Sequence, residues 1–94
     1  MIGSWKSKTA QAIFLGRDPG KGFPADLVAV TRRRLARLDE ATQIEDLASP
    51  PGHRLHRLSG ERSNQWSISV NMQWRICFEW TETGPMNVEI VDYH

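Results

Sequence analysis

The feature that most constrains this chain is a stretch of alternating side chains between residues 66 and 80. Large apolar residues occupy every second position on both sides of a short interruption at 71–73, which is the period-two pattern of half-buried strands. Because successive strand side chains point to opposite faces, we expect an antiparallel hairpin with two unlike faces. The core face would carry Trp66, Ile68, Val70, Trp74, Ile76, Phe78 and Trp80, and the opposite face Ser67, Ser69, Arg75, Cys77 and Glu79.

The N-terminal part of the chain predicts two helices. Ser7 fits the N-cap of a first helix that stops near Gly16. Pro24 fits the first position of a second helix over Ala25 to Ala41, where apolar residues recur at helical spacing. Other expected elements are a helical turn at Gln43 to Ala48 and strands at Ile2 to Lys6, Arg54 to Leu58 and Asn87 to Val91, the last after a turn at Gly84-Pro85. Together they predict an α+β fold, with helices on the tryptophan-rich face of an antiparallel sheet and the other face open.

Length and composition indicate one globular domain over residues 1–94. The chain has 94 residues, 39% of them hydrophobic, and four tryptophans, enough for a single modest core. No apolar run could span a bilayer and the N-terminus lacks a signal peptide, so we expect a cytoplasmic protein with no membrane partner. The single cysteine, Cys77, cannot form an internal disulfide and is expected to be a small buried hydrophobe.

The net charge of +1 conceals a strong asymmetry along the chain. Residues 1–37 hold eight Lys or Arg against two acids, and residues 53–75 hold four against one, while the other two segments are acidic. Basic patches on a nearly neutral protein indicate binding to a polyanion at particular surfaces. For Arg32 to Arg34, a merely solvated helix face is an equally good interpretation.

Three histidines are candidates for proton transfer, since histidine titrates near neutral pH. His53 and His56 flank an expected strand, and His94 ends the sequence after Asp92 and Tyr93. A lone histidine such as His53 is more often structural than catalytic.

A phosphodiester substrate suits this set of residues. Cleaving RNA with its own 2′-hydroxyl requires a base, an acid and cationic donors for the charged phosphorane. His56, Asp92 and His94 could transfer protons, Arg75 could contact the phosphate, and Tyr93 could stack on a base. No structural zinc pattern, glycine-rich phosphate loop or serine nucleophile motif is present, so no metal or cofactor is expected.

Several motifs together resemble the HigB branch of the RelE/ParE toxin superfamily, the toxins of type II toxin–antitoxin modules. The motifs are the opening Met1 to Lys6, Leu35 to Thr42, Leu55 to Gly60, Trp66 to Val70, Trp74 to Ile76 and the terminal Asp92-Tyr93-His94. The resemblance implies a microbial-RNase-like α+β fold and ribosome-dependent cleavage of mRNA. It also implies a helix-turn-helix, HigA-like antitoxin as partner, so that DNA is contacted only through the antitoxin.

The resemblance also implies roles for particular residues. The family's catalytic positions fall on His56, Arg75, Asp92, Tyr93 and His94, and the candidate RNA-binding residues are Arg54, Arg57, Arg62, Arg32 and Arg33. One position departs from the family pattern, because Ser59 stands where many relatives have a lysine that contacts phosphate. Arg57 or Arg62 could restore this charge from a neighbouring position.

Two alternatives to a ribosome-dependent endoribonuclease stay open. The loss of the lysine at Ser59 is compatible with a weak or inactive toxin that serves as antitoxin partner and corepressor. A gyrase inhibitor of the ParE type would leave mRNA intact, and the terminal Asp92-Tyr93-His94 argues against it. In each case we expect the two helices and their loop to face an acidic antitoxin through Lys21, Arg32, Arg33 and Arg37.

Overall fold

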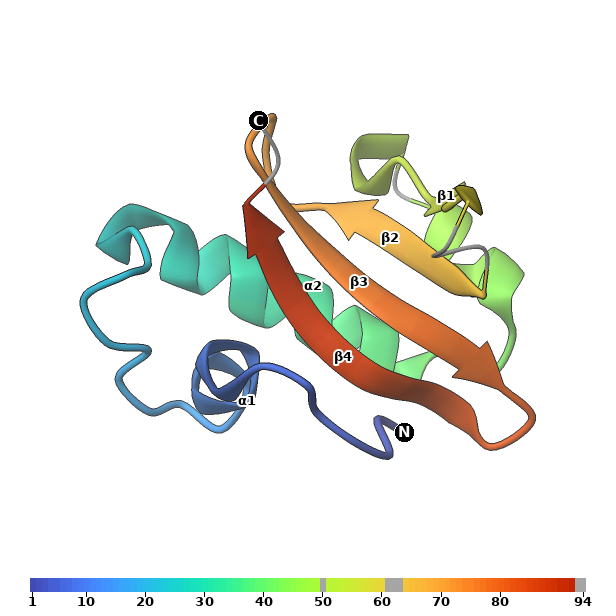
Figure 1. Cartoon of the computed structure of the whole chain (residues 1–94), viewed down its shortest axis with the longest axis horizontal. Helices are drawn as coiled ribbons and strands as arrows, with labels where there is room; N and C mark the ends of the chain where they lie inside the picture. Colours follow the sequence, from blue (N-terminus) through green and yellow to red (C-terminus); the bar gives the residue numbers. More distant parts are fainter. Residues whose placement is uncertain (50, 61–63, 93–94) are drawn as a thin grey trace.

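The computed structural model describes residues 1–49, 51–60 and 64–92. Its helices are α1 (Lys8–Phe14) and α2 (Val28–Glu40), with short 3₁₀ helices η1 (Ala25–Leu27), η2 (Ile44–Ala48) and η3 (Pro51–His53). Its strands are β1 (His56–Arg57), β2 (Gln65–Ser69), β3 (Trp74–Thr81) and β4 (Gly84–Asp92). The strands form one antiparallel sheet in the order β1-β2-β3-β4, and the helices lie beside it (Figure 1). The expected α+β fold is therefore confirmed.

The hairpin predicted from the alternating pattern is formed by β2 and β3. Trp66 is opposite Phe78 and Ile68 is opposite Ile76, so the expected core face is assembled in register. The turn between the strands is held by Asn71, whose Oδ1 accepts hydrogen bonds from the backbone N–H groups of Gln73 and Trp74. This local side-chain cap satisfies backbone donors that the ladder leaves unpaired.

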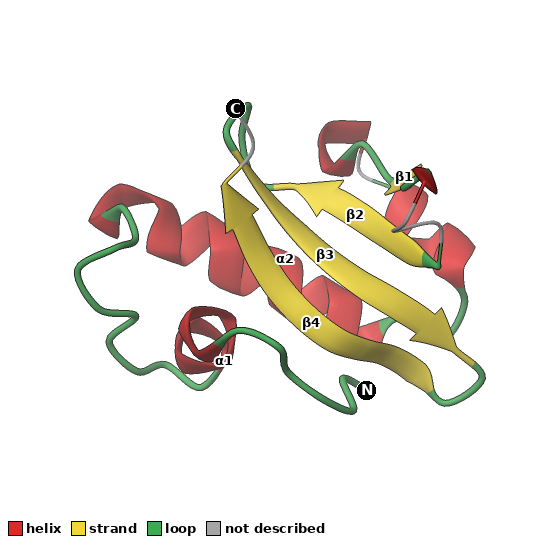
Figure 2. Ribbon diagram, viewed as in Figure 1, coloured by secondary structure: helices red, strands yellow, loops and turns green. Residues whose placement is uncertain are grey.

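The first helix begins as the sequence predicts, but the second helix expected from Ala25 is divided into η1 and α2, which begins only at Val28. Ser7 caps α1 by accepting a hydrogen bond from the Ala10 N–H. Helix α2 crosses behind the sheet (Figure 2) and buries Thr31, Leu35 and Leu38 against it. The core that results contains Ile13, Phe23, Leu35, Leu38, Ala41, Leu47, Ile68, Val70, Ile76, Phe78 and Val88. None of the helices in the described part of the chain is long and apolar enough to cross a membrane.

Three strand boundaries differ from the prediction. The expected strand at residues 2–6 is reduced to a single parallel bridge between Trp5 and Val88. Strand β1 contains only His56 and Arg57, because the backbone of Arg54 adopts a positive φ that no strand tolerates. Strand β4 already begins at Gly84, so the chain reverses at residues 82–83 and not at Gly84-Pro85. A proline is accommodated there because β4 is an edge strand.

The second face of the sheet is less open than expected. Ser67 and Cys77 are completely buried, and the guanidinium of Arg75 lies over Ser67. Cys77 is thus the buried, unbridged thiol that the sequence predicts. A ligand could reach this face beside Arg75 and β1, where Arg54 and His56 also line a cavity.

We predict that Ile76→Ala lowers the free energy of unfolding by about 2–5 kcal/mol, the usual cost of emptying a core position. Ile76 is fully buried in β3, where it is paired with Ile68 of β2 on one side and with Ile90 of β4 on the other. The matched control is Met72→Ala in the turn of the same hairpin, where the side chain is 97% exposed. Urea unfolding should show a change of less than about 0.5 kcal/mol for the control. Equal effects of the two substitutions would contradict this account of the core.

Candidate active site

The candidate site is built around Arg75, on the sheet face opposite the helices. Arg75 Nε donates to Ser67 Oγ at 2.9 Å, across the β2–β3 pair. Arg75 Nη2 donates to the backbone carbonyl of Arg54 at 3.0 Å. Because these contacts come from two directions, they fix both the position and the plane of the guanidinium.

Arg54 occupies an unusual backbone conformation beside this arginine. Its φ is +46°, in the left-handed region that residues other than glycine rarely adopt, and its N–H donates to the Pro51 carbonyl at 3.0 Å. Such a conformation costs about 1–3 kcal/mol and persists only where surrounding contacts hold it. Here the carbonyl of the strained residue accepts the hydrogen bond from Arg75.

Arg54 and Arg75 together line two cavities. One, of about 370 Å³, is lined by Arg54, His56, Leu58, Ser67 and Arg75. The other, of about 320 Å³, is lined by Gly52, Arg54, Ser69, Val70, Asn71, Met72 and Arg75. We call the two cavities together the arginine groove. Among the described residues that line it none is acidic, so the groove is positively charged and complementary to a phosphate backbone.

Strand register determines which predicted residues share the groove. His56 is opposite Ser67, and the two therefore point to the same face as Arg75. Arg57 is opposite Trp66, and its guanidinium lies 5.8 Å from the centre of that indole ring. The placement of Arg57 beside the phosphate is therefore wrong, because a strand neighbour of His56 must project to the other face.

The predicted C-terminal residues are only partly described. Asp92 is exposed and ends β4 opposite Trp74, so register directs it to the face opposite Arg75. It nevertheless lies at the same end of the sheet as the β2–β3 turn, where the second cavity opens. Arg62, Tyr93 and His94 lie outside the described residues.

The predicted cations of helix α2 lie away from the groove. Arg32 and Arg33 are exposed on α2, which packs against the other face of the sheet. Arg32 Nε also donates to the Ile13 carbonyl at 2.9 Å and so ties α2 to α1. Lys21, Arg33 and Arg37 are exposed as expected. These residues are available to a partner, but the structure does not bring them to His56 and Arg75.

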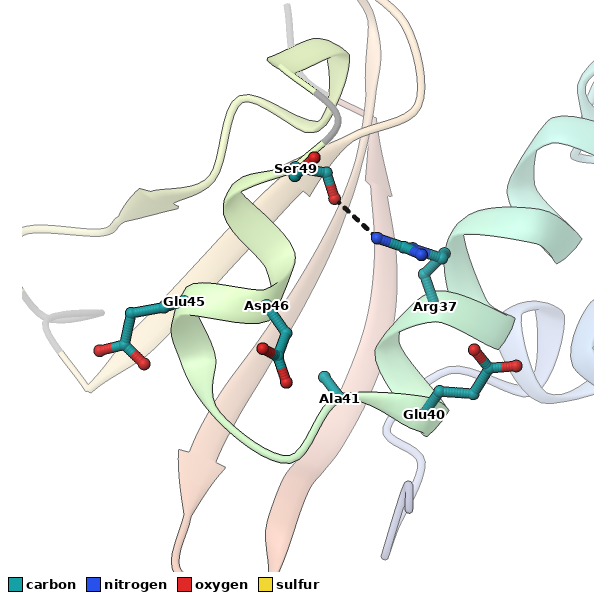
Figure 3. A pocket seen from close by; sticks show the side chains of 6 residues that line it. All are labelled: Arg37, Glu40, Ala41, Glu45, Asp46 and Ser49. Atoms are coloured by element: carbon teal, nitrogen blue, oxygen red, sulfur yellow. Dashed lines mark hydrogen bonds between the residues drawn. The ribbon is translucent and has the colours of Figure 1, made fainter.

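A further hollow separates the end of α2 from η2. Figure 3 shows its lining residues, Arg37, Glu40, Ala41, Glu45, Asp46 and Ser49. Arg37 Nη2 donates to the Ser49 carbonyl at 3.0 Å. The carboxylate of Asp46 accepts from the backbone N–H groups of Thr42 and Gln43, which lowers its pKa. These bonds cap η2, so Asp46 has a structural role.

His53 is buried beside η2 and does not line the arginine groove. Only 1% of its surface is exposed, and its Nδ1 lies 3.1 Å from the Leu47 carbonyl oxygen. Burial lowers its pKa, and the charges of Arg34 and Arg37 lower it further, against an opposing effect of the Leu47 hydrogen bond. The ring therefore stays neutral at neutral pH.

Some features of the site could not be identified from sequence. Nothing in the sequence marked the Arg54 carbonyl as an acceptor for a side chain 21 residues away. Ser67 was expected on the correct face, but its role as a hydrogen-bond partner of Arg75 emerges only from the register. Within the described ranges, no three histidine, cysteine or carboxylate side chains come together in a way that could hold a metal ion.

The amino-acid sequence of this chain is similar to those of known toxins. A family model described as RelE-like toxin of the type II toxin–antitoxin system HigB matches residues 4–94. The chain is 35% identical over 94 residues to endoribonuclease HigB of Proteus vulgaris, with 100% of both chains covered. It is 36% identical over 65 residues to toxin HigB-1 of Vibrio cholerae, which covers 69% of this chain and 68% of that protein.

The class defined by the fold and the matched model is that of the RelE-like toxins. Within this class, the chain belongs to the HigB family of type II toxin–antitoxin systems. Membership implies an antitoxin as its partner.

We predict that the free energy of unfolding falls as the pH is lowered from about 7.5 through the ordinary histidine pKa of about 6.5. In this pH range His53 becomes protonated in the unfolded chain but stays neutral in the folded protein, because folding lowers its pKa. One proton contributes a slope of at most about 1.4 kcal/mol per pH unit. Urea unfolding of wild type and His53→Gln over this range isolates the effect. Parallel curves for the two proteins would refute it.

Proposed function

We propose that this protein is a toxin that inhibits translation as a ribosome-dependent mRNA endonuclease acting in the cytoplasm. In the proposed reaction the 2′-hydroxyl of the RNA attacks the adjacent phosphate, giving a 2′,3′-cyclic phosphate and a free 5′-hydroxyl. This reaction requires a base, an acid and cations, but no metal ion. The observation that carries the proposal is the fixed guanidinium of Arg75 in a cavity that His56 also lines.

Arg75 would stabilise the phosphorane. Ser67 and the Arg54 carbonyl hold its guanidinium before substrate arrives, so little reorganisation is needed when negative charge develops. His56 lines the same cavity from β1 and is exposed, within reach of a phosphate bound there. Its imidazole could serve as base or acid in the transfer of one proton.

The remaining proton-transfer groups would come from the C-terminus. Strand β4 ends at Asp92, at the end of the sheet where the second cavity opens, and Tyr93 and His94 follow in sequence. We assign His94 to proton transfer and Tyr93 to stacking on a base of the mRNA. The family pattern gives Asp92 a proton-transfer role as well, at the end of β4, even though register directs its side chain to the face opposite Arg75. This assignment rests on the sequence and on the family pattern.

Arg54 is the best candidate for the second cation. Ser59 carries no charge, and Arg57 lies over Trp66 on the other face. Arg54, in contrast, is exposed and lines both cavities beside Arg75. Its guanidinium could therefore supply the charge that a lysine at position 59 supplies in many relatives, which favours an active toxin over an inactive corepressor.

The partners of this activity would be the ribosome with its mRNA and a HigA-like antitoxin with a helix-turn-helix domain. The exposed cations Lys21, Arg33 and Arg37 lie on and before α2, away from the groove. We assign this basic surface to the acidic antitoxin, and DNA would be contacted only through the antitoxin. Arg32 and Arg33 could alternatively contact ribosomal RNA.

The activity is tested with purified protein and ribosomes carrying a defined mRNA. Wild type should cut the message only when ribosomes are present and leave 2′,3′-cyclic phosphate ends. Arg75→Ala should reduce the rate about 10²- to 10³-fold, the usual cost of losing a donor to a developing oxyanion. His56→Ala should reduce it about 10²-fold or more. Cleavage by Arg75→Ala at the wild-type rate would refute the role of the groove.

The substitute role of Arg54 is tested by suppression. Arg54→Ala should slow cleavage roughly 10- to 100-fold, as expected for one charge-assisted contact. Adding Ser59→Lys to that variant should recover most of the lost cleavage rate, because the new lysine supplies the second cation at the position where many relatives have one. Arg57→Ala is the matched control and should cut at nearly the wild-type rate. If Arg57→Ala is the more damaging single variant, Arg54 is not the second cation.

A further inference from the structure

A hollow that the proposed activity does not use lies beside the exposed side of α2. It encloses about 410 Å³ and is lined by Arg33, Arg34, Ala36, Arg37, Glu40 and His53. It shares Arg37 and Glu40 with the hollow of Figure 3 but none of its lining residues with the arginine groove. With three arginines against one glutamate, it attracts anions.

The buried histidine of this hollow has an unused hydrogen-bond acceptor. Since the Leu47 carbonyl can only accept, the proton of neutral His53 must reside on Nδ1. Nε2 is then a bare lone pair, and this buried atom has no partner among the described residues. His53 is 1% exposed, and the nearby charges of Arg34 and Arg37 disfavour adding a proton to Nε2.

The neighbouring arginine has an unused donor. Arg34 Nε is buried and likewise has no partner within the described part of the chain. The guanidinium of Arg34 lies against Gly52, the residue before His53, because a side-chain carbon at Gly52 would be 3.6 Å from Nη2. A buried polar atom without a partner is destabilising. Because Arg34 and His53 both line the hollow, their unused donor and acceptor point to a ligand there.

The chemistry of these atoms restricts that ligand. It must be an anion, accept a hydrogen bond from Arg34 and donate one to His53. A carboxylate or a sulfate offers acceptors only, and would leave Nε2 unsatisfied or force a proton onto it. A phosphate group that retains a proton offers both, because P–O⁻ accepts from the arginines and P–OH donates to Nε2.

We propose that this hollow binds a protonated phosphate group through Arg34 and His53, with Arg33 and Arg37 supplying charge at the rim. The group could be inorganic phosphate or the terminal phosphate of a nucleotide, which share this chemistry. The site is independent of the catalytic proposal, since none of these four residues lines the arginine groove.

The test follows the side-chain ¹⁵N signals of the histidines while inorganic phosphate, sulfate, acetate or uridine 5′-monophosphate is added to the full-length protein at pH 6.5. Phosphate should shift the Nε2 signal of His53 to saturation, and at least tenfold more sulfate or acetate should be needed for the same effect, because these anions lack the donor. Saturation by the mononucleotide at tenfold lower concentration would identify a nucleotide phosphate as the ligand. Otherwise free phosphate is the ligand. The His56 signal reports binding in the arginine groove separately.

Two variants separate hydrogen bonding from charge. His53→Phe should bring the affinities for phosphate and sulfate to within about twofold of each other, because it removes the acceptor. Arg33→Gln should weaken both anions equally and keep their ratio. Arg17→Gln, the same charge change at an exposed position outside the hollow, should alter neither. Should His53→Phe fail to fold, Arg34→Met provides the second reading, with a predicted loss of phosphate binding of tenfold or more.

Three outcomes would overturn the proposal. An Nε2 signal of His53 that does not move with phosphate shows that water alone occupies the hollow. Equal affinity for phosphate, sulfate and acetate shows a general anion or carboxylate socket, as expected for an acidic side chain of a protein partner. Full phosphate binding by Arg34→Met shows that the anion lies elsewhere.

Discussion

The guanidinium of Arg75 is the point on which the functional face depends. Its two hydrogen bonds join β3 to Ser67 of β2 and to the backbone of Arg54, so one side chain links the sheet to the segment before β1. Burying Ser67 beneath it leaves a hydroxyl that must be satisfied, and the arginine satisfies it. The site is therefore rigid because it is part of the packing, and rigidity is what electrostatic catalysis needs.

The arginine groove and the hollow beside α2 are lined by consecutive residues, Arg54 and His53. His53 faces α2 and η2, whereas the next residue, Arg54, turns to the opposite side through its left-handed backbone. The conformational cost of that turn is compensated by the hydrogen bond that the Arg54 carbonyl accepts from Arg75. Because Arg54 cannot belong to a strand in this conformation, β1 is only two residues long.

Structural features that depend on local sequence patterns could be predicted, whereas features that depend on contacts between distant residues could not. Alternation is local, so the faces of the β2–β3 hairpin and the pairing of Ile68 with Ile76 were predictable. The same rule predicts that Arg57, next to His56 in the strand, points to the opposite face, as the register shows. The conformation of Arg54 was not predictable, because it depends on a contact with Arg75 across 21 residues. The turn predicted at Gly84-Pro85 was wrong, because both residues pair with β3 as part of the edge strand β4.

The most direct test of the central claim is the mapping of mRNA 5′ ends in cells after brief induction of the toxin, comparing wild type with Arg75→Ala and His94→Ala. The account predicts new ends inside translated regions with wild type and their disappearance in both variants. The same ends in Arg75→Ala would contradict the role of the arginine groove. Growth arrest with no new ends, accompanied by a DNA-damage response, would contradict mRNA cleavage itself and indicate a gyrase-directed toxin.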